Sequence, residues 1–123
     1  MSTTINIYAP GGDITGQATG TVTAKRALKI SGNRTGGNVA VAPADAAGRI
    51  FGVAADDAAV GELVAVARGS GRVVKVTAGG TIAAFAEVEV GTGGKVVTKT
   101  SGVAVGYALT GATLDTDAEI SLA

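Results

Sequence analysis

The side chains of this sequence that could perform chemistry are carboxylates. The chain contains no histidine and no cysteine, which removes His-based triads, thiol nucleophiles and the usual transition-metal ligands. Two acidic groups remain: Asp56, Asp57 and Glu62, and the alternating Asp115, Asp117 and Glu119. Either group could offer oxygen ligands to calcium, but neither has EF-hand spacing. We therefore favour solvated turns and a charged strand edge that blocks unwanted pairing, with no metal and no cofactor.

The remaining catalytic motifs are incomplete. Gly69-Ser70-Gly71 is predicted to be a tight turn between two strands, since no serine lies in a nucleophile motif. The stretch 91–95 resembles a phosphate-binding loop, but Val96 replaces the required Ser or Thr, so a hairpin turn is favoured. A carboxylate-pair hydrolase stays open as an alternative if the acidic residues near Asp56 converge with Glu87 or Glu89. The chain has few aromatic residues to hold a substrate, and we expect no enzyme.

The composition indicates one small domain with a thin core. Hydrophobic residues make up 46% of the 123 residues, yet the chain has two Phe, two Tyr and no Trp. Because the apolar residues are mostly Ala and Val, each buried side chain contributes little, and we expect association to supply part of the stability. The net charge of zero is consistent with association.

Charge is distributed unevenly along the chain. Residues 1–34 have a net charge of +3 and residues 100–123 a net charge of −3. The two interpretations are solvated strand edges and an electrostatic contact between copies or with another protein. The basic cluster Lys25, Arg26, Lys29 and Arg34 lacks interleaved aromatic residues, so we expect no nucleic-acid binding. No apolar run is long enough for a membrane span, and the start lacks the pattern of a signal peptide.

The elements that must position these residues are short strands. Val/Ala-rich runs alternate with glycine-containing turns every 8–12 residues or so, which is typical of an all-β barrel or sandwich. Residues 1–24 have few large side chains and are predicted to form an extended N-terminal arm, followed by a single β domain at 25–123. One or two short helical turns are possible at 57–60 and 81–85. Gly52-Val-Ala and Gly102-Val-Ala are similar, but no internal repeat extends beyond them.

The order of these pieces resembles the capsid cement (head decoration) proteins of tailed bacteriophages. The resemblance rests on the succession 8–18, 29–32, 48–54, 56–62, 63–68, 72–77, 78–82, 87–90 and 101–109, which covers nearly the whole chain. It implies a small all-β protein that binds the outer surface of an expanded phage head and stabilises contacts between capsomers. The implied partners are the major capsid protein and the protein itself, as a homotrimer at three-fold and quasi-three-fold positions. The implied location is the outer virion surface, after synthesis in the cytoplasm of the bacterial host.

This resemblance transfers no individual contact residue, so the candidate contacts come from exposed arm and charge features. They are Ile5, Ile7, Tyr8, Pro10, Ile14, Lys25, Arg26, Lys29 and Arg34. Tyr107 is interpreted as a core or interface residue. The main alternative is a host-binding or carbohydrate-binding β-module displayed on a virion, which would need aromatic platforms that this chain scarcely supplies.

Overall fold

Strands account for nearly all the regular structure. The computed structural model describes residues 7–8 and 11–123. The strands are β1 (Ile14–Ala18), β2 (Ala27–Thr35), β3 (Asn38–Pro43), β4 (Gly52–Ala54), β5 (Leu63–Ala67), β6 (Val73–Thr77), β7 (Glu87–Val90), β8 (Val96–Thr98), β9 (Gly106–Ala108) and β10 (Asp117–Leu122). One 3-10 turn, η1 (Thr92–Gly94), lies between β7 and β8. The expected all-β fold is confirmed.

The first half of the chain forms a closed five-stranded barrel. Its strand order is β1-β3-β2-β4-β5, and β5 pairs with β1 to close the circle. All neighbouring pairs are antiparallel except β1 with β3, which is parallel. A closed barrel leaves no unpaired edge. Closure therefore protects strands as short as β4 from pairing with other chains.

Strand β1 revises the expected boundary at residue 24. Residues 14–18 belong to the barrel, and Val22 bonds to Ala58 across it. Ile14 and Ala18 are buried, so residues 14–18 are ordered within the barrel and do not depend on a partner for their structure. The sequence concealed the strand because its inward positions are an isoleucine, a glycine and an alanine, which look like loop composition. Residues 1–6 and 9–10 of the expected arm lie outside the described residues.

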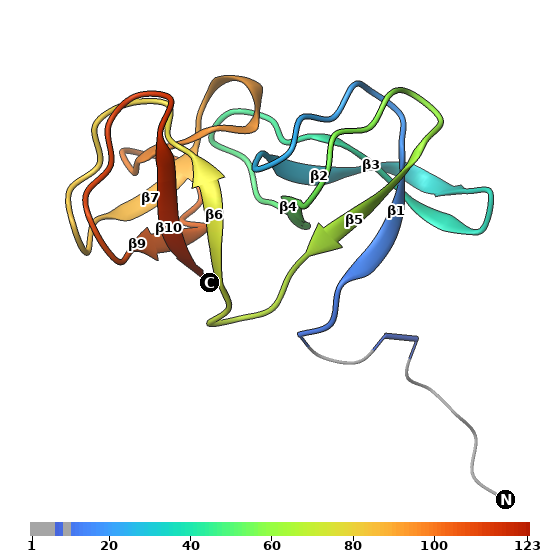
Figure 1. The fold of residues 1–123 in the computed structure, drawn as a ribbon, viewed down its shortest axis with the longest axis horizontal. Helices are drawn as coiled ribbons and strands as arrows, with labels where there is room; N and C mark the ends of the chain where they lie inside the picture. The colour runs from blue at the N-terminus through green and yellow to red at the C-terminus, as the bar shows by residue number, and fades with distance from the viewer. Residues whose placement is uncertain (1–6, 9–10) are drawn as a thin grey trace, which may run out of the picture.

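The second half of the chain repeats the topology of the first. Its strand order is β6-β10-β9-β7-β8, so β6 to β10 correspond in turn to β1 to β5. The outer strands of this sheet are β6 and β8, and a parallel bridge between Ala78, directly after β6, and Val96 of β8 connects them. The equivalent position in the first barrel is the parallel pair Ala18 and Val41. Figure 1 shows the two halves side by side, β1–β5 on the right and β6–β10 on the left.

One turn occurs four times in this duplicated fold. Each turn begins with an alanine at or beside the end of a strand. The fourth residue after this alanine forms an isolated β-bridge with the opposing turn, and the seventh has a positive φ. The bridging pairs are Val22 with Ala58 and Ile82 with Ala112. The positive-φ residues are Lys25, Gly61, Phe85 and Asp115, with φ between 62° and 88°. Each of them donates its backbone N–H to the alanine carbonyl of the opposing turn, over 2.7–2.8 Å: Ala54, Ala18, Ala108 and Ala78 respectively.

These turns correct two sequence expectations. The chain does contain an internal repeat, although only backbone conformation and small buried residues are preserved between its copies. The expected helical turns at 57–60 and 81–85 are instead parts of these bridged turns. Glycine suits Gly61, where φ is +88°, but Phe85 takes the equivalent position with a bulky side chain.

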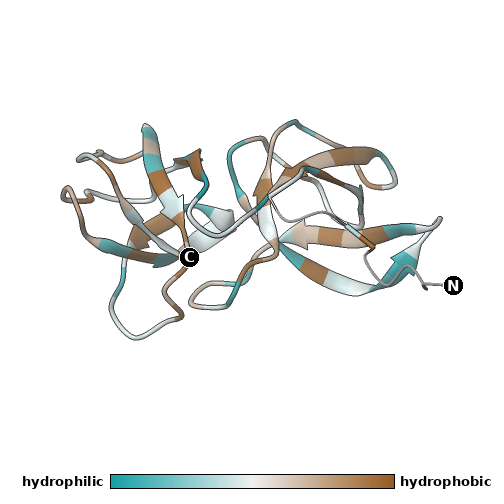
Figure 2. Cartoon of the chain, turned by 90° about the horizontal axis from the view of Figure 1, so that it is seen from below, coloured by the Kyte–Doolittle hydropathy of each residue, from teal (hydrophilic) through white to brown (hydrophobic). Residues whose placement is uncertain are grey.

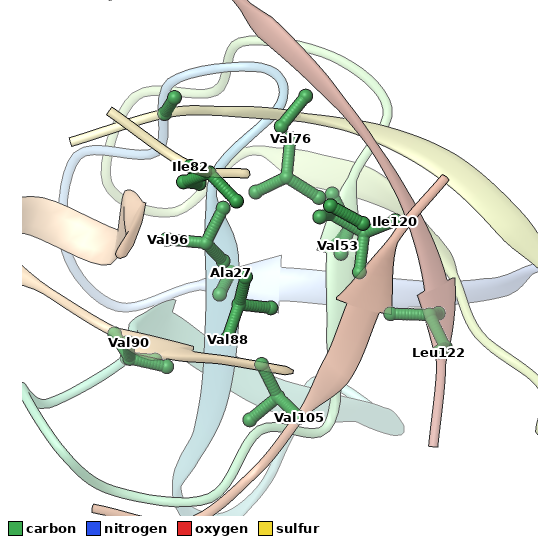
Figure 3. Close-up of a cluster of buried hydrophobic side chains, with 14 residues drawn as sticks. Ala27, Val53, Val76, Ile82, Val88, Val90, Val96, Val105, Ile120 and Leu122 are labelled. Carbon is green, nitrogen blue, oxygen red and sulfur yellow. The ribbon is translucent and has the colours of Figure 1, made fainter. Parts of the chain in front are cut away.

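Two hydrophobic clusters hold the fold together. One lies inside the first barrel, around Leu28, Val41, Val64 and Val66. The other fills the second half, yet it also includes Ala27, Ala44 and Val53 from the first barrel. Figure 3 shows Ala27 and Val53 among side chains of the second half, including Val88 and Ile120. The two halves therefore share a core, which favours one cooperative unit over two independent ones.

The turns predicted from glycine fall where strands change direction. Residues 91–95 form the predicted hairpin turn between β7 and β8. Gly69-Ser70-Gly71 lies in the predicted turn between two strands, β5 and β6, which belong to different sheets, so this turn links the two halves. Figure 2 shows hydrophobic and pale bands alternating along the strands. No helix in the described part of the chain is long and apolar enough to cross a membrane.

Candidate functional site

The acidic residues do not form a metal site in the part of the chain that the structure describes. No group of three carboxylates lies close enough to hold an ion there. Asp115 pairs with Lys95 and Asp117 pairs with Lys25, at 2.7 and 3.0 Å. The loop that contains Asp56 and Asp57 belongs to the first barrel, whereas Glu87 and Glu89 lie on β7 of the second half. The carboxylates are therefore distributed over turns and ion pairs.

Glu89 is the buried carboxylate, and its contacts are structural. Its Oε1 accepts hydrogen bonds from the backbone N–H and the hydroxyl of Thr100, at 2.5 and 2.7 Å. The bond from the Thr100 N–H is the largest cause of a lowered Glu89 pKa, and the hydroxyl bond adds to it, against the opposing effect of burial. A Cβ on Gly102 would collide with this carboxylate and with Ala47, so glycine is required for the close approach. Glu89 thus holds the segment 100–103 against β7.

The basic cluster predicted as a contact surface is largely used within the chain. Lys25 pairs with Asp117, Lys29 pairs with Asp45 at 2.8 Å, and Arg26 donates to the carbonyl of Gly93 at 3.2 Å. The bonds of Lys25 and Arg26 both join the first barrel to the second half. The ammonium groups of Lys25 and Lys29 are partly exposed but have internal partners, and Arg26 is half-buried, with its Nε unpaired among the described residues.

Arg34 and Tyr8 form a contact on the outside of the first barrel. Both terminal nitrogens of Arg34 lie 3.2 Å from the Tyr8 hydroxyl, and the guanidinium carbon is 5.7 Å from the ring centre. Arg34 lies in the β2–β3 hairpin, whose residues 31–37 are all exposed. The equivalent β7–β8 hairpin is shorter, so this projection is specific to the first barrel. It keeps Tyr8 beside the barrel.

The other predicted contact residues divide into three groups. Ile7 is 78% exposed and can reach a partner. Ile14 is buried in the barrel, so its prediction as a contact is wrong for this fold. Ile5 and Pro10 lie outside the described residues. Beyond Pro10, Arg72 holds the chain through an ion pair with Asp13 at 2.6 Å.

An exposed aromatic pair lies on the second half. Phe85 is 80% exposed, and its ring meets Tyr107 edge to face with centres 5.3 Å apart. Phe85 also has φ of +68°, which is costly for a bulky side chain. Leu109 and Val73 are exposed as well, and β9 and β6 both border β10 in this sheet. Sequence reasoning placed Tyr107 in a core or interface but gave Phe85 no role.

A basic hollow between the two halves was also missed. Two adjoining cavities of about 300 and 570 Å³ share Arg49, Ile50, Phe51 and Arg68 in their walls. The guanidinium of Arg68 stacks over the Phe51 ring at 4.4 Å. Neither Arg49 nor Arg68 has an ion-pair partner among the described residues. The nearest sequence signal was two isolated arginines, which no motif connects.

Comparisons with known proteins give one family match and one similar fold. The model of the phage cement protein family matches residues 8–122. No curated protein matches the chain. A solved structure that is similar is the N base of head fiber gp8.5 of bacteriophage phi29, with a TM-score of 0.78 and 22% sequence identity. That similarity covers 91% of this chain and 93% of the phi29 chain, and at this identity it supports the fold.

Proposed function

This chain belongs to the phage cement protein family, and on this basis we propose that it binds the outer surface of an expanded phage head and stabilises contacts between capsomers. The family is one of phage structural proteins. The observation on which the proposal rests is the family match over residues 8–122, which spans both halves of the duplicated fold.

The continuous packing between the barrel and the second sheet supports a mechanical role. The halves share a hydrophobic cluster, and Lys25–Asp117 and Arg26–Gly93 add contacts between them. Packed interiors resist deformation because their side chains interdigitate at high density. A body of this kind can transmit force between two attachment points without unfolding between them.

We assign the shell contacts to two exposed surfaces. The first is the N-terminal surface, consisting of Ile7, Tyr8 and the β2–β3 hairpin with Arg34. The second is the aromatic surface, consisting of Phe85, Tyr107 and Leu109. Exposed apolar and aromatic groups are favoured at interface centres because their burial releases water at low entropic cost. Lys25 and Lys29 remain partly exposed beside their internal partners and can add a secondary contact.

The partner we propose is the major capsid protein, with further contacts between copies of this chain in a homotrimer at three-fold and quasi-three-fold positions. Several weak contacts in each subunit, repeated around a symmetry axis, would combine into strong attachment. The protein would be made in the bacterial cytoplasm and would join the head after expansion, once the matching surface of the shell has formed.

Cosedimentation with phage heads tests this function. Purified protein is mixed with expanded heads that lack it and, as a control, with unexpanded heads from the same phage. Saturable binding to expanded heads alone supports the proposal. Absence of binding to expanded heads contradicts it and would direct attention to the displayed binding module.

A further inference from the structure

The hollow between the two halves has the character of a protein-binding surface. It combines apolar side chains, Ile50, Phe51 and Val103, with the guanidinium groups of Arg49 and Arg68. Lys29 also borders it, but Asp45 neutralises that charge. Two unpaired arginines beside an aromatic ring suit an acidic partner that also has apolar side chains.

The same chain contains a segment with that chemistry. Residues 55–62 form the loop between β4 and β5, and they include Asp56, Asp57 and Glu62 with no basic residue. Asp56 is exposed and accepts no hydrogen bond within the described residues. Val60 and Leu63 are 65% and 59% exposed, which adds apolar surface beside the carboxylates. We call residues 55–63 the acidic loop and the hollow around Arg49 and Arg68 the basic cleft.

The acidic loop cannot reach the basic cleft of its own molecule. Strand β5 starts at Leu63, the last residue of the acidic loop, and ends at Ala67, directly before Arg68. Five residues of strand separate the two features by roughly 17 Å. The cleft and the loop therefore lie at opposite ends of the β4–β5 hairpin, where a contact between them must join two molecules.

We propose that the acidic loop of one copy docks into the basic cleft of a second copy. In this contact Asp56 faces the free guanidinium groups, and Val60 and Leu63 cover the apolar wall formed by Ile50 and Phe51. The two surfaces differ from each other, so each copy offers one donor and one acceptor surface. This proposal deepens the homotrimer part of the proposed function, because it names the surfaces through which copies would associate.

Backbone contacts prepare the loop for docking. Asp57 accepts a hydrogen bond from the Ala24 N–H at 2.7 Å, and Glu62 accepts one from the Ala59 N–H at 2.7 Å. Val22 and Ala58 also exchange backbone bonds across the barrel. Because the loop is already ordered, binding would cost little conformational entropy. Asp57 and Glu62 have structural roles, so the test leaves them unchanged.

Charge exchange between the two surfaces provides the test, with the oligomeric mass measured by sedimentation velocity at low ionic strength. The cleft variant is Arg49→Glu with Arg68→Glu, and the loop variant is Asp56→Lys with Val60→Lys. We expect self-association at least about tenfold weaker in each variant, because like charges then face each other. A chain with all four substitutions should regain part of the association. Lys75→Glu, on an exposed part of β6, is the matched control and should associate normally.

The outcomes separate this inference from the proposed function. A monomeric native protein, unchanged association in both variants, or no recovery in the fourfold variant would each overturn the docking. Thermal unfolding of every variant verifies that the fold is intact. Cosedimentation with expanded heads is measured separately. If the cleft variant self-associates normally but no longer binds heads, the basic cleft binds an acidic segment of the shell. That result would overturn the contact between copies.

Discussion

Lys25 Nζ lies 3.0 Å from Asp117 Oδ2, and this ion pair joins the first barrel to the second half of the molecule. The two residues come from the chain's basic start and its acidic end. The carbonyl of Lys25 also accepts the N–H of Thr77, which pairs with Asp117 in the β6–β10 register. The opposite charges of the two ends are thus partly matched inside one molecule, at the joint between the halves.

A double-mutant cycle at this joint should give a small coupling energy. We expect Lys25→Ala and Asp117→Ala to couple by about 0.2–1 kcal/mol, because both side chains are partly exposed. Urea unfolding of the two single variants and the double variant measures the coupling. The value should decrease at high salt. A salt-independent coupling of several kcal/mol would contradict this account.

The shared core predicts that the two halves unfold together. Ile120→Ala removes a fully buried side chain from the shared cluster and should lower the free energy of unfolding by about 2–5 kcal/mol. Val66→Ala, in the first barrel, should also lower the single common midpoint. Ile30→Ala is the matched control, since Ile30 is 47% exposed and should cost much less. Amide hydrogen exchange measures the opening of each half separately. Different unfolding free energies for the two halves would contradict the shared core.

N-terminal deletions should distinguish the segment before β1 from the barrel strand. Removing residues 1–10 should leave the fold intact, because strand pairing begins at Ile14. Removing residues 1–24 should abolish cooperative unfolding, since it deletes β1 and opens the barrel. Far-UV circular dichroism and thermal unfolding measure both effects. Cooperative unfolding of the longer deletion would show that β1 is dispensable. If the N-terminal surface binds the shell, the shorter deletion should also weaken head binding.

Phe85 and Gly61 occupy equivalent turn positions, but their substitutions should affect the protein differently. Gly61→Ala should cost about 1 kcal/mol, because alanine is disfavoured at φ of +88°. Phe85→Asn should change stability by less than about 1 kcal/mol, since the relief of backbone strain offsets the lost contact with Tyr107. The same substitution should weaken attachment to heads if the aromatic surface is a contact. Normal attachment of Phe85→Asn would remove Phe85 from the interface.

The lowered pKa of Glu89 predicts acid sensitivity with a defined sign. The folded state holds the carboxylate in its charged form, so its contribution is complete above the ordinary pKa of 4.5 and is lost as pH falls through the lower folded pKa. The native protein should therefore lose more stability than Glu89→Gln when pH decreases below about 4.5. Thermal unfolding as a function of pH measures the difference. Parallel curves would show that Glu89 does not contribute in this way.

Much of the fold was predictable because most strands have a simple local signal. Short apolar runs separated by glycine-containing turns predicted an all-β fold of many short strands, which the structure confirms. Strand β1 was missed because Gly16 and Ala18 fill its inward positions, where little space is left beside Val41. The repeat was missed because its four turns share a backbone hydrogen-bond pattern, which no side chain encodes strongly. Its residual signal is an alanine four residues before an apolar or small residue, as in Ala78 and Ile82.

The candidate surfaces were harder to predict because they depend on long-range placement. Lys25, Arg26 and Lys29 formed the clearest charge cluster in the sequence, yet the fold supplies partners for each of them. Arg49 and Arg68 are isolated in sequence, and only the β4–β5 pairing brings them to one cleft. Local sequence patterns predict which residues form a strand. The way the strands close into a barrel then determines which charged side chains remain without an ion-pair partner.

Cryo-electron microscopy of expanded heads saturated with this protein tests the central claim most directly. The account predicts ordered density on the outer surface that contacts two neighbouring capsomers, with the barrel and the second sheet fitting as one rigid unit. Heads without the protein should lack this density and should disrupt at a lower temperature. Heads that acquire no density, or density confined to a single capsomer with no gain in stability, would contradict a cement function.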